Sequence, residues 1–353
     1  MQKKRILFLG ETYRADAITW MNGLKEFGDF EIVTWELKKR SVGINRFGRL
    51  VELLMAFFTI KKIAKSFKPD MIIAERTTSY GFLAAISGIK PTAIAQQGIT
   101  DLWPHDSPLF FFKKILQDYA FLKADLIHSW GKVMTHHMQK SKVDMNKVME
   151  LPKGINLDYF EFNDNQDLNT IHAIVTRSLE TVYKHKTILK AFSIIKKKNI
   201  PFTLRIVGDG SKLASLKKLA STLNIEQEVI FEGRLPNTKV AELLQNSNFY
   251  ISMPTTEGVS SSLFEAMACG CFPIVTNLLG NKSWINNREN GILIPSDNYK
   301  ILAQEIIEAY ERPLWRKAVV ERNRKFVEEK TNYKTNMTLI AERYHQLIHS
   351  KNN

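Results

Sequence analysis

Two acidic residues in one short segment have the type and spacing of a ligand-binding pair. Glu257 and Glu265 are separated by seven residues in MPTTEGVSSSLFEAMACGCFPIVTN (253–277), and a run of small residues follows Glu257. The pattern predicts a loop, a helix that starts near Ser260 and a buried strand over Phe272–Thr276. Free N–H groups at a helix N-terminus suit a pyrophosphate, and carboxylates accept hydrogen bonds from sugar hydroxyls. The segment therefore favours a nucleotide-sugar site. An ordinary strand–helix loop with capping serines and two solvated acids is the open alternative.

This segment and four others resemble the donor-site region of family 4 retaining glycosyltransferases, which have the GT-B fold. The four are LPKGINLDYF (151–160), TRSLETVYKHKTILKAF (176–192), LRIVGDGSKLASLKKLA (204–220) and VIFEGRLP (229–236). Their order and spacing make the resemblance specific over residues 151–295, whereas the N-terminal half shares only a general strand–helix rhythm. The resemblance implies a retaining glycosyltransferase with a nucleotide-sugar donor.

The resemblance also implies roles for residues of the C-terminal half. Arg177 and Lys184, with Lys186 as the alternative to Lys184, are expected to hold the pyrophosphate, where fixed positive charge stabilises the transition state. Glu257 is expected to accept hydrogen bonds from the transferred sugar, and Glu265 from the ribose. Arg177, Lys184 and Glu257 are thus the expected catalytic residues. The other expected donor contacts are Gly258, Val259, Ser260 and Ser261 through their backbone amides, and Arg234 and Leu235 beside the nucleobase.

The implied chemistry needs neither a metal ion nor another cofactor. The departing phosphate is expected to deprotonate the acceptor on the same face of the sugar, without a covalent nucleophile. No His, Cys and Asp cluster in the sequence has metal-ligand spacing. A glycosidase would use the two glutamates as acid and nucleophile. It is disfavoured because a serine-rich helix start suits a phosphate and has no purpose in simple hydrolysis.

Alternating strand and helix patterns run along the whole chain and predict an α/β protein. Strands are predicted at Ile6–Leu9, Glu31–Trp35, Met71–Ala74, Thr92–Ala95, Leu126–Ser129, Val148–Leu151, Ile171–Val175, Thr203–Val207, Val229–Phe231, Phe249–Ser252, Phe272–Thr276 and Gly291–Ile294. Helices are predicted between them, among them Phe47–Lys65, Gly81–Ser87 and Leu109–Leu122. Strands alternating with helices imply parallel sheets with right-handed crossovers.

The break at Pro152–Gly154 divides this rhythm into two Rossmann-like domains, which are expected to face a central cleft. The predicted acceptor domain is 1–152, completed by a C-terminal helix within 336–353, and the predicted donor domain is 153–335. A dinucleotide-dependent dehydrogenase has the same general architecture. It is disfavoured because the first strands of both halves end in GETYRAD and VTRSLE, without a G-x-G-x-x-G turn.

The acceptor side is predicted only from the rule that ligands bind at the carboxyl ends of parallel strands. Glu11 and Arg14 follow the first strand, and Gln97 and Asp101 follow the fourth. In many relatives a histidine stands near the end of the fourth strand, and this chain has AIAQQGITDLWPHD there. These four residues are therefore candidates for acceptor binding, and Asp101 is a candidate base.

Charge suggests a surface partner for the N-terminal half. The net charge is +14, and residues 38–68 carry nine Lys or Arg against one acid, together with several Phe and Leu residues. A basic helix with aromatic residues can lie on an anionic membrane, and PLFFFKK (108–114) would extend that surface. The alternative is an ordinary amphipathic helix with lysines in water. No recognised nucleic-acid motif accompanies the charge, so no specific nucleic-acid partner is expected.

The two cysteines and the hydropathy pattern bear on location. No apolar run is long enough to span a bilayer, and the start reads as a first strand rather than a signal peptide. Cys269 and Cys271 flank one glycine and are interpreted as small buried residues. A cytoplasmic protein, peripheral on the inner face of the cell membrane, is therefore expected.

These interpretations combine into one functional hypothesis. The chain is expected to transfer a sugar from a nucleotide donor, with UDP as the expected nucleotide, to a glycan or lipid-linked acceptor. A bacterial lipopolysaccharide, capsule or exopolysaccharide precursor is the expected product. The alternatives are a non-catalytic relative that binds sugar nucleotides and a basic protein that binds nucleic acid or another polyanion.

Overall fold

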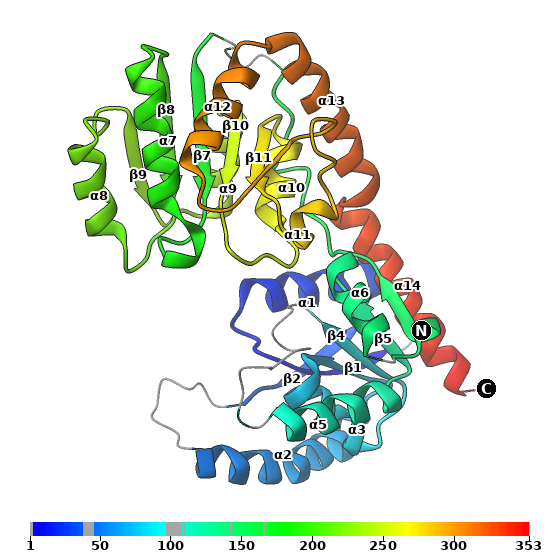
Figure 1. Ribbon diagram of the computed structural model, residues 1–353. Helices are drawn as coiled ribbons and strands as arrows, with labels where there is room; N and C mark the ends of the chain where they lie inside the picture. The colour runs from blue at the N-terminus through cyan, green and yellow to red at the C-terminus, as the bar shows by residue number, and fades with distance from the viewer. Residues whose placement is uncertain are drawn as a thin grey trace. The chain divides into compact units, whose positions relative to one another are not determined.

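The chain forms two compact units, shown in Figure 1. The computed structural model describes residues 3–37, 46–96, 108, 110–141, 143–164, 167 and 169–352. Unit 1 comprises Met1–Lys153 together with Lys334–Asn353, and unit 2 comprises Gly154–Tyr333. The C-terminal segment therefore belongs to the same unit as the N-terminus.

Unit 1 contains a parallel sheet, six-stranded in the described part of the chain, with the order β2-β1-β3-β4-β5-β6. The central strands are continuous apolar runs, and Ile6, Leu7, Phe8 and Leu9 of β1 have no exposed surface, as expected for a sheet covered on both faces. The strands are β1 (Arg5–Leu9), β2 (Glu31–Trp35), β3 (Met71–Glu75), β4 (Thr92–Gln96), β5 (Leu126–Ser129) and β6 (Val148–Glu150).

Helices cover both faces of this sheet, and Figure 1 shows α2, α3 and α5 on one face and α1 and α6 on the other. They are α1 (Ala15–Gly28), α2 (Arg46–Phe67), a π-helical turn η2 (Thr77–Gly81), α3 (Phe82–Ser87), α5 (Phe110–Lys123), α6 (Lys132–Lys140), a 3-10 turn η3 (Met145–Lys147) and α14 (Tyr333–Asn352). The last helix, α14, is integral to unit 1. The buried Tyr344 hydroxyl lies 3.3 Å from Nδ1 of the buried His128, and His345 stacks on Phe30 with ring centroids 4.3 Å apart.

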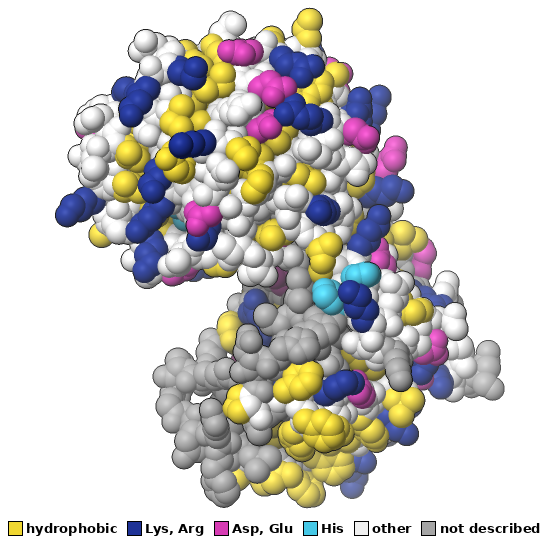
Figure 2. All heavy atoms as spheres, in the orientation of Figure 1, with side chains coloured by type: hydrophobic (Ala, Val, Ile, Leu, Met, Phe, Trp, Pro, Cys, Tyr) yellow, Lys and Arg dark blue, Asp and Glu magenta, His cyan; other side chains and the backbone are white. Residues whose placement is uncertain are grey.

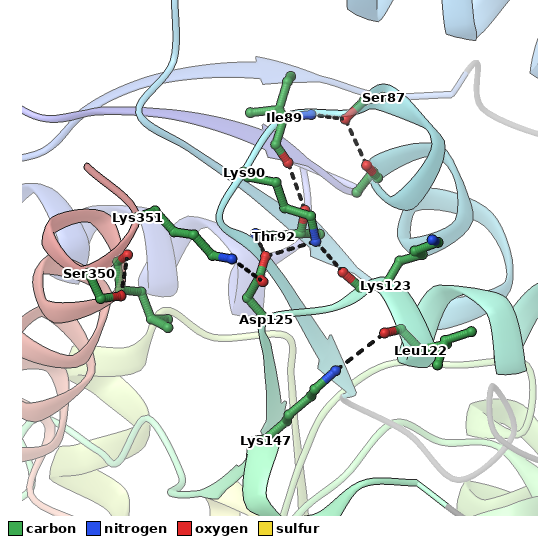
Figure 3. A network of polar contacts seen from close by, with 12 residues as sticks. Ser87, Ile89, Lys90, Thr92, Leu122, Lys123, Asp125, Lys147, Ser350 and Lys351 are labelled. Carbon is green, nitrogen blue, oxygen red and sulfur yellow. Dashed lines mark hydrogen bonds and ion pairs between the residues drawn. The ribbon is translucent and has the colours of Figure 1, made fainter. Parts of the chain in front are cut away.

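A carboxylate at the amino edge of this sheet ties α14 to β4 and β5, as Figure 3 shows. Asp125, just before β5, accepts hydrogen bonds from the Thr92 backbone N–H at 2.9 Å and from Lys90 Nζ at 2.9 Å. Lys351 of α14 adds an ion pair at 3.4 Å, and Lys90 Nζ also donates to the Lys123 carbonyl oxygen. The pKa of Asp125 is lowered, because these hydrogen bonds and lysines outweigh the burial that raises it.

Unit 2 contains a second parallel sheet, also six-stranded among the described residues, with the order β12-β11-β10-β7-β8-β9. Its strands are β7 (Ile171–Thr176), β8 (Phe202–Val207), β9 (Val229–Gly233), β10 (Phe249–Ser252), β11 (Phe272–Thr276) and β12 (Ile292–Ile294). Its helices are a 3-10 turn η4 (Thr181–Tyr183), α7 (His185–Lys197), α8 (Leu213–Thr222), α9 (Asn237–Gln245), α10 (Ser261–Ala268), α11 (Leu279–Lys282), α12 (Tyr299–Tyr310) and α13 (Pro313–Lys330).

Two hydrophobic clusters sandwich the second sheet. One contains residues of α7, α8 and α12, including Ile188, Leu216 and Ile306. The other contains residues of α9 and α10, including Leu244 and Met267. Cys269 and Cys271 belong to the second cluster and are fully buried thiols, which agrees with their interpretation as small packing residues.

The predicted Rossmann-like organisation of the two halves is confirmed, and most predicted strand bounds are within one residue of those observed. The main difference lies after β3. A single helix was predicted from Gly81, but Gly81 ends the π-helical turn Thr77–Gly81, and α3 begins at Phe82. Arg76, between β3 and this turn, has φ 74°. Hydrophobic periodicity carries no signal for a five-residue π-helical turn.

Candidate active site

Arg177 is the centre of a polar cluster at the carboxyl edge of the second sheet. It follows the last residue of β7, and its Nε donates to Ser252 Oγ at 3.1 Å. Its Nη2 donates to the Glu257 carboxylate and to Ser260 Oγ. The Arg177 and Glu257 side chains are only 14% and 10% exposed. The structure thus brings together Arg177, Glu257 and Ser260, which the sequence predicted to belong to one site.

The start of α10 fixes the acidic loop relative to Arg177. Ser260 is the N-cap of α10, and its Oγ accepts a hydrogen bond from the Leu263 backbone N–H at 3.3 Å. The next hydroxyl, Ser262 Oγ, lies 2.9 Å from the hydroxyl of the buried Tyr250 on β10. The alternative interpretation of this segment was a loop with capping serines and no ligand. Ser260 does cap α10, but its Oγ also accepts a hydrogen bond from Arg177, so the same side chain caps the helix and belongs to the polar cluster.

Close backbone approaches at two glycines position the cluster. A Cβ atom on Gly208, in the GDG turn after β8, would lie 2.3 Å from the Arg177 carbonyl oxygen. A Cβ atom on Gly280, in α11, would lie 2.4 Å from the Glu257 carbonyl oxygen. Both distances are far below van der Waals contact, so each glycine lets a second segment press against a site residue. Gly280 was not among the predicted site residues, and an LLGNK segment gave no motif by which to find it.

In the turn between β7 and α7, the neighbouring side chains of Tyr183 and Lys184 contact different partners. The Tyr183 ring lies 5.5 Å from the Arg177 guanidinium. Lys184 has φ 51°, and its Nζ forms an ion pair with Asp297 Oδ2 at 2.7 Å. Lys186, the alternative phosphate lysine, is exposed on the first turn of α7. Lys184 is therefore held by a carboxylate, and its assignment to the donor phosphates stays a prediction.

The remaining predicted donor contacts line the same segments. Glu265 is half-buried on α10, Gly258 and Val259 are half-buried, and Ser261 is exposed. After β9, Arg234 is exposed, and Leu235 packs against the hydrophobic cluster that also contacts Val259. Their roles towards a nucleotide stay predictions.

Arg177 stays charged in this environment. Burial opposes its charge, but Tyr250, Glu257 and Tyr183 outweigh burial, and the pKa of the guanidinium is raised. A fixed cation with little exposed surface at the end of a strand can stabilise negative charge that develops on a departing group, because little reorganisation is needed.

At the carboxyl edge of the first sheet, Glu11 is held by two arginines. Its Oε2 accepts from Arg76 Nη2 at 2.7 Å and from Arg14 Nη1 at 3.2 Å. Two of the predicted acceptor-side residues, Glu11 and Arg14, therefore contact each other. The other two, Gln97 and Asp101, lie outside the described residues.

Sequence reasoning missed the residues that complete this edge. Glu75, the last residue of β3, is fully buried and accepts a hydrogen bond from the Glu11 backbone N–H at 2.8 Å. Burial raises the pKa of Glu75. The available signal was an acid and a base, Glu75-Arg76, directly after the apolar run MIIA. No group of three or more His, Cys, Asp or Glu within the described ranges could hold a metal ion.

Two family models match this chain. The model described as glycosyl transferases group 1 matches residues 160–328, and the model described as glycosyl transferase 4-like matches residues 6–130. Together they cover most of both sheets. The chain belongs to the family 4-like glycosyltransferases of the GT-B fold.

Individual relatives of this glycosyltransferase are distant. An uncharacterized glycosyltransferase of Methanocaldococcus jannaschii is 24% identical over 68% of this chain and 63% of its own length. The N-acetyl-alpha-D-glucosaminyl L-malate synthase of Bacillus anthracis is 32% identical over 36% of this chain and 32% of its own length. The chain thus spans less than two thirds of these relatives.

The fold is matched over nearly the whole length by a solved structure. The Anabaena protein HepE, crystallised with UDP, superposes with a TM-score of 0.78 over 98% of this chain and 100% of HepE, at 14% identity. At this identity the match establishes the fold alone, and it confirms the predicted GT-B class. No described helix is both long and apolar enough to cross a membrane.

Proposed function

We propose that this chain is a retaining glycosyltransferase that moves a sugar from a UDP-sugar to a glycan or lipid-linked acceptor. The observation that carries the proposal is Arg177, held by Glu257, Ser252 and Ser260 at the carboxyl edge of the second sheet. This edge is where open α/β sheets bind ligands, and it lies in the region that the glycosyl transferases group 1 model matches.

The proposed reaction assigns one task to each group. Glu265 holds the ribose hydroxyls, Glu257 accepts hydrogen bonds from the transferred sugar, and Arg177 with Lys184 neutralises the diphosphate. The bond between the anomeric carbon and the diphosphate oxygen breaks. A bond to the acceptor oxygen forms on the same face of the sugar, and the acceptor proton passes to the departing phosphate. With two side-chain cations at the diphosphate, the proposed transfer needs no metal ion.

UDP is the proposed nucleotide because a protein of the same fold has been crystallised with it. HepE structures contain UDP, UDP with glucose, and UDP-glucose. The segments proposed for the base and ribose, after β9 and on α10, leave Arg234 exposed and Glu265 half-buried. Both side chains are therefore accessible to a nucleotide at this edge.

A lipid-linked acceptor is proposed from the surface of unit 1. Exposed large apolar residues line α2 and α5, and both helices pack against α3. They are Val51, Leu54, Met55 and Phe58 on α2 and Phe111, Phe112, Ile115, Tyr119 and Leu122 on α5. Figure 2 shows hydrophobic side chains gathered over α5. We call this set the α2–α5 surface.

Lysines accompany the α2–α5 surface. Lys61, Lys62, Lys65, Lys114 and Lys123 are exposed on the same two helices. Apolar side chains with nearby lysines suit the interface of an anionic bilayer. Part of the basic stretch 38–68 lies outside the described residues, and the side chains of Phe47 and Leu50 are not described. We propose a peripheral enzyme on the cytoplasmic face of a bacterial membrane, acting on a lipopolysaccharide, capsule or exopolysaccharide precursor.

The proposal is tested by thermal shift with UDP, GDP, ADP and CMP and by transfer assays with the sugar conjugate of the nucleotide that binds. A ligand that binds only the native state raises the melting temperature. A shift with UDP, together with transfer or slow hydrolysis of a UDP-sugar, is the expected result. Binding without any turnover would favour a non-catalytic relative, and a shift with another nucleotide would correct the donor.

A further inference from the structure

Lys184 and Asp297 form an ion pair between two loops of unit 2. The ion pair is 2.7 Å long, and both residues have left-handed backbone conformations, with φ 51° at Lys184 and φ 64° at Asp297. Such conformations are uncommon for residues other than glycine. Strain of this kind gathers at functional sites, where surrounding contacts hold it in place.

Asp297 is bound on both carboxylate oxygens. Lys184 Nζ donates to Oδ2, and Thr187 Oγ1 donates to Oδ1 at 2.5 Å. The pKa of Asp297 is lowered by these hydrogen bonds. Asp297 follows β12 and precedes α12, and α12 packs against α7, whose N-cap is Lys184. The pair therefore links two loops that follow strands of the same sheet.

Each proposed phosphate cation of unit 2 consequently has a carboxylate partner. Arg177 is paired with Glu257, and Lys184 is paired with Asp297. The two pairs differ in exposure, because Lys184 and Asp297 are 28% and 57% exposed, whereas the Arg177–Glu257 pair is largely buried. An exposed pair contributes little stability and is easily exchanged.

We propose that Asp297 and the donor diphosphate compete for the Lys184 ammonium, and that the diphosphate takes this ammonium over from Asp297 when it binds. The inference rests on the proposed function. A diphosphate carries more charge than one carboxylate and offers several acceptor oxygens to an ammonium. Asp297 is thus a positioning residue that competes with the diphosphate for Lys184 and thereby weakens diphosphate binding.

If the Lys184–Asp297 ion pair had only a structural role, variants of these two residues would differ from the wild type in another way. If the pair only fastened α7 to the β12–α12 loop, removing either charge would lower the melting temperature, and neither change would alter diphosphate affinity. In the proposed exchange, the two changes shift affinity in opposite directions. The sign of the effect at Asp297 therefore separates the two explanations.

The test uses Asp297→Asn and Lys184→Gln in the full chain, with calorimetric binding of UDP and of inorganic pyrophosphate. Asparagine tolerates the left-handed conformation at 297, so the first variant leaves the backbone unstrained. The matched controls are Glu228→Gln and Lys196→Gln. Lys196 pairs with Glu228 at the other end of α7, so each control changes the net charge equally at the opposite edge of the sheet.

Asp297→Asn is expected to bind UDP about two- to fivefold more tightly, since an exposed pair is worth up to ~1 kcal/mol. Lys184→Gln is expected to bind it about tenfold or more weakly, because a charge-assisted hydrogen bond to phosphate is lost. The double variant should match Lys184→Gln, and both controls should match the wild type. Unchanged or weaker binding by Asp297→Asn, or unchanged binding by Lys184→Gln, would overturn the exchange.

Failure of the proposed function has its own signature. If the wild-type protein and both controls bind no nucleoside diphosphate, the donor assignment falls and the exchange falls with it. If they bind UDP but the UDP affinities of the Lys184→Gln and Asp297→Asn variants do not change as expected, the donor assignment stands and the exchange alone is rejected.

Discussion

The Arg177 guanidinium and the Glu257 carboxylate form an ion pair although 80 residues separate them in the chain. Two parallel strands, β7 and β10, are adjacent in the sheet; β7 ends just before Arg177, and the loop that carries Glu257 follows β10. The topology therefore brings the cation proposed for the phosphates beside the carboxylate proposed for the transferred sugar. Any change at one of these residues leaves the other with little exposed surface and without its partner.

Replacing Glu257 by Gln should separate sugar positioning from nucleotide binding. The amide keeps the shape of the side chain but loses the charge, so we expect kcat to fall by about 10²–10³-fold, the effect of losing one preorganised electrostatic contact. UDP affinity should change much less, because UDP lacks the sugar that Glu257 is proposed to contact. Steady-state kinetics and calorimetry measure the two effects. Equal losses in both would mean that Glu257 acts mainly through Arg177.

Replacing Glu265 by Ala should impair UDP binding directly, in contrast to the Glu257→Gln change, which should mainly lower kcat. If Glu265 holds the ribose hydroxyls, its removal abolishes calorimetric UDP binding, while binding of inorganic pyrophosphate persists. Glu242→Ala, which removes an exposed acid on the neighbouring helix α9, serves as the control and should bind UDP normally. Undiminished sugar transfer by Glu265→Ala would remove its assigned role.

Replacing Gly280 by Ala tests the contact between α11 and the acidic loop. Helix propensity alone predicts that alanine raises the free energy of unfolding by about 0.5–1 kcal/mol relative to glycine. The added Cβ would lie 2.4 Å from the Glu257 carbonyl oxygen, so the loop must move. We expect a loss of up to about 10²-fold in kcat, typical of a misplaced catalytic group. Lys282→Ala, on the exposed side of the same short helix, should leave kcat unchanged, and a fully active Gly280→Ala would show that the loop is not held by α11.

The Asp125 cluster gives a pH-dependent stability prediction. The pKa of Asp125 is lowered on folding, so its stabilisation is present above the unfolded value of about 3.9 and is lost as pH falls through the folded value. Asp125→Asn should lower the free energy of unfolding by about 1 kcal/mol at neutral pH, because Lys90 and Lys351 lose their anionic partner. The difference from the wild type should shrink in acid.

Urea titrations followed by tryptophan fluorescence measure this difference, since the buried Trp20 and Trp130 lie in unit 1. Asp118→Asn removes an exposed carboxylate paired with Lys114 and serves as the control with little expected effect. A destabilisation of Asp125→Asn that persists unchanged in acid would assign the effect to packing rather than to charge.

The α2–α5 surface predicts binding to anionic vesicles. Leu122→Ser should weaken binding by about tenfold or more, because burying one leucine contributes roughly 1.5–3 kcal/mol. Leu314→Ser is the matched control: Leu122 is 71% and Leu314 82% exposed, and Leu314 lies on α13 of unit 2. Replacing Lys61, Lys62 and Lys65 together by Glu should release the protein from anionic vesicles. Unchanged sedimentation of both variants with such vesicles would reject the membrane proposal.

Much of the fold was predictable because its elements have strong local signals. Strands such as Phe249–Ser252 and Phe272–Thr276 are continuous apolar runs, and their bounds in the structure equal the predicted ones. The N-cap of α10 was predictable from a serine before an apolar helix. The π-helical turn Thr77–Gly81 was missed because nothing in its composition separates it from an ordinary helix start.

The sequence predicted which residues belong to the candidate site, but it predicted only some of the contacts between them. Arg177 and Glu257 were expected near one donor, and the structure adds that they form an ion pair with each other. The partner of Lys184, Asp297, lies 113 residues further along the chain. Gly280 carries no local motif, and the only signal at Glu75 is an acid and a base directly after an apolar run. Contacts of this kind depend on which loops the sheet order brings together, and spacing within a segment holds no information about them.

The membership of α14 in unit 1 has a consequence for biosynthesis. Translation releases β1 to β6 first, but Tyr344, which packs beside His128 of β5, emerges only after all of unit 2. At about 5–20 residues per second, the nascent first sheet waits on the order of ten seconds or more for its last helix. During that time the face of the sheet that α14 will occupy is uncovered, and unit 1 cannot complete its fold until its last helix has been made.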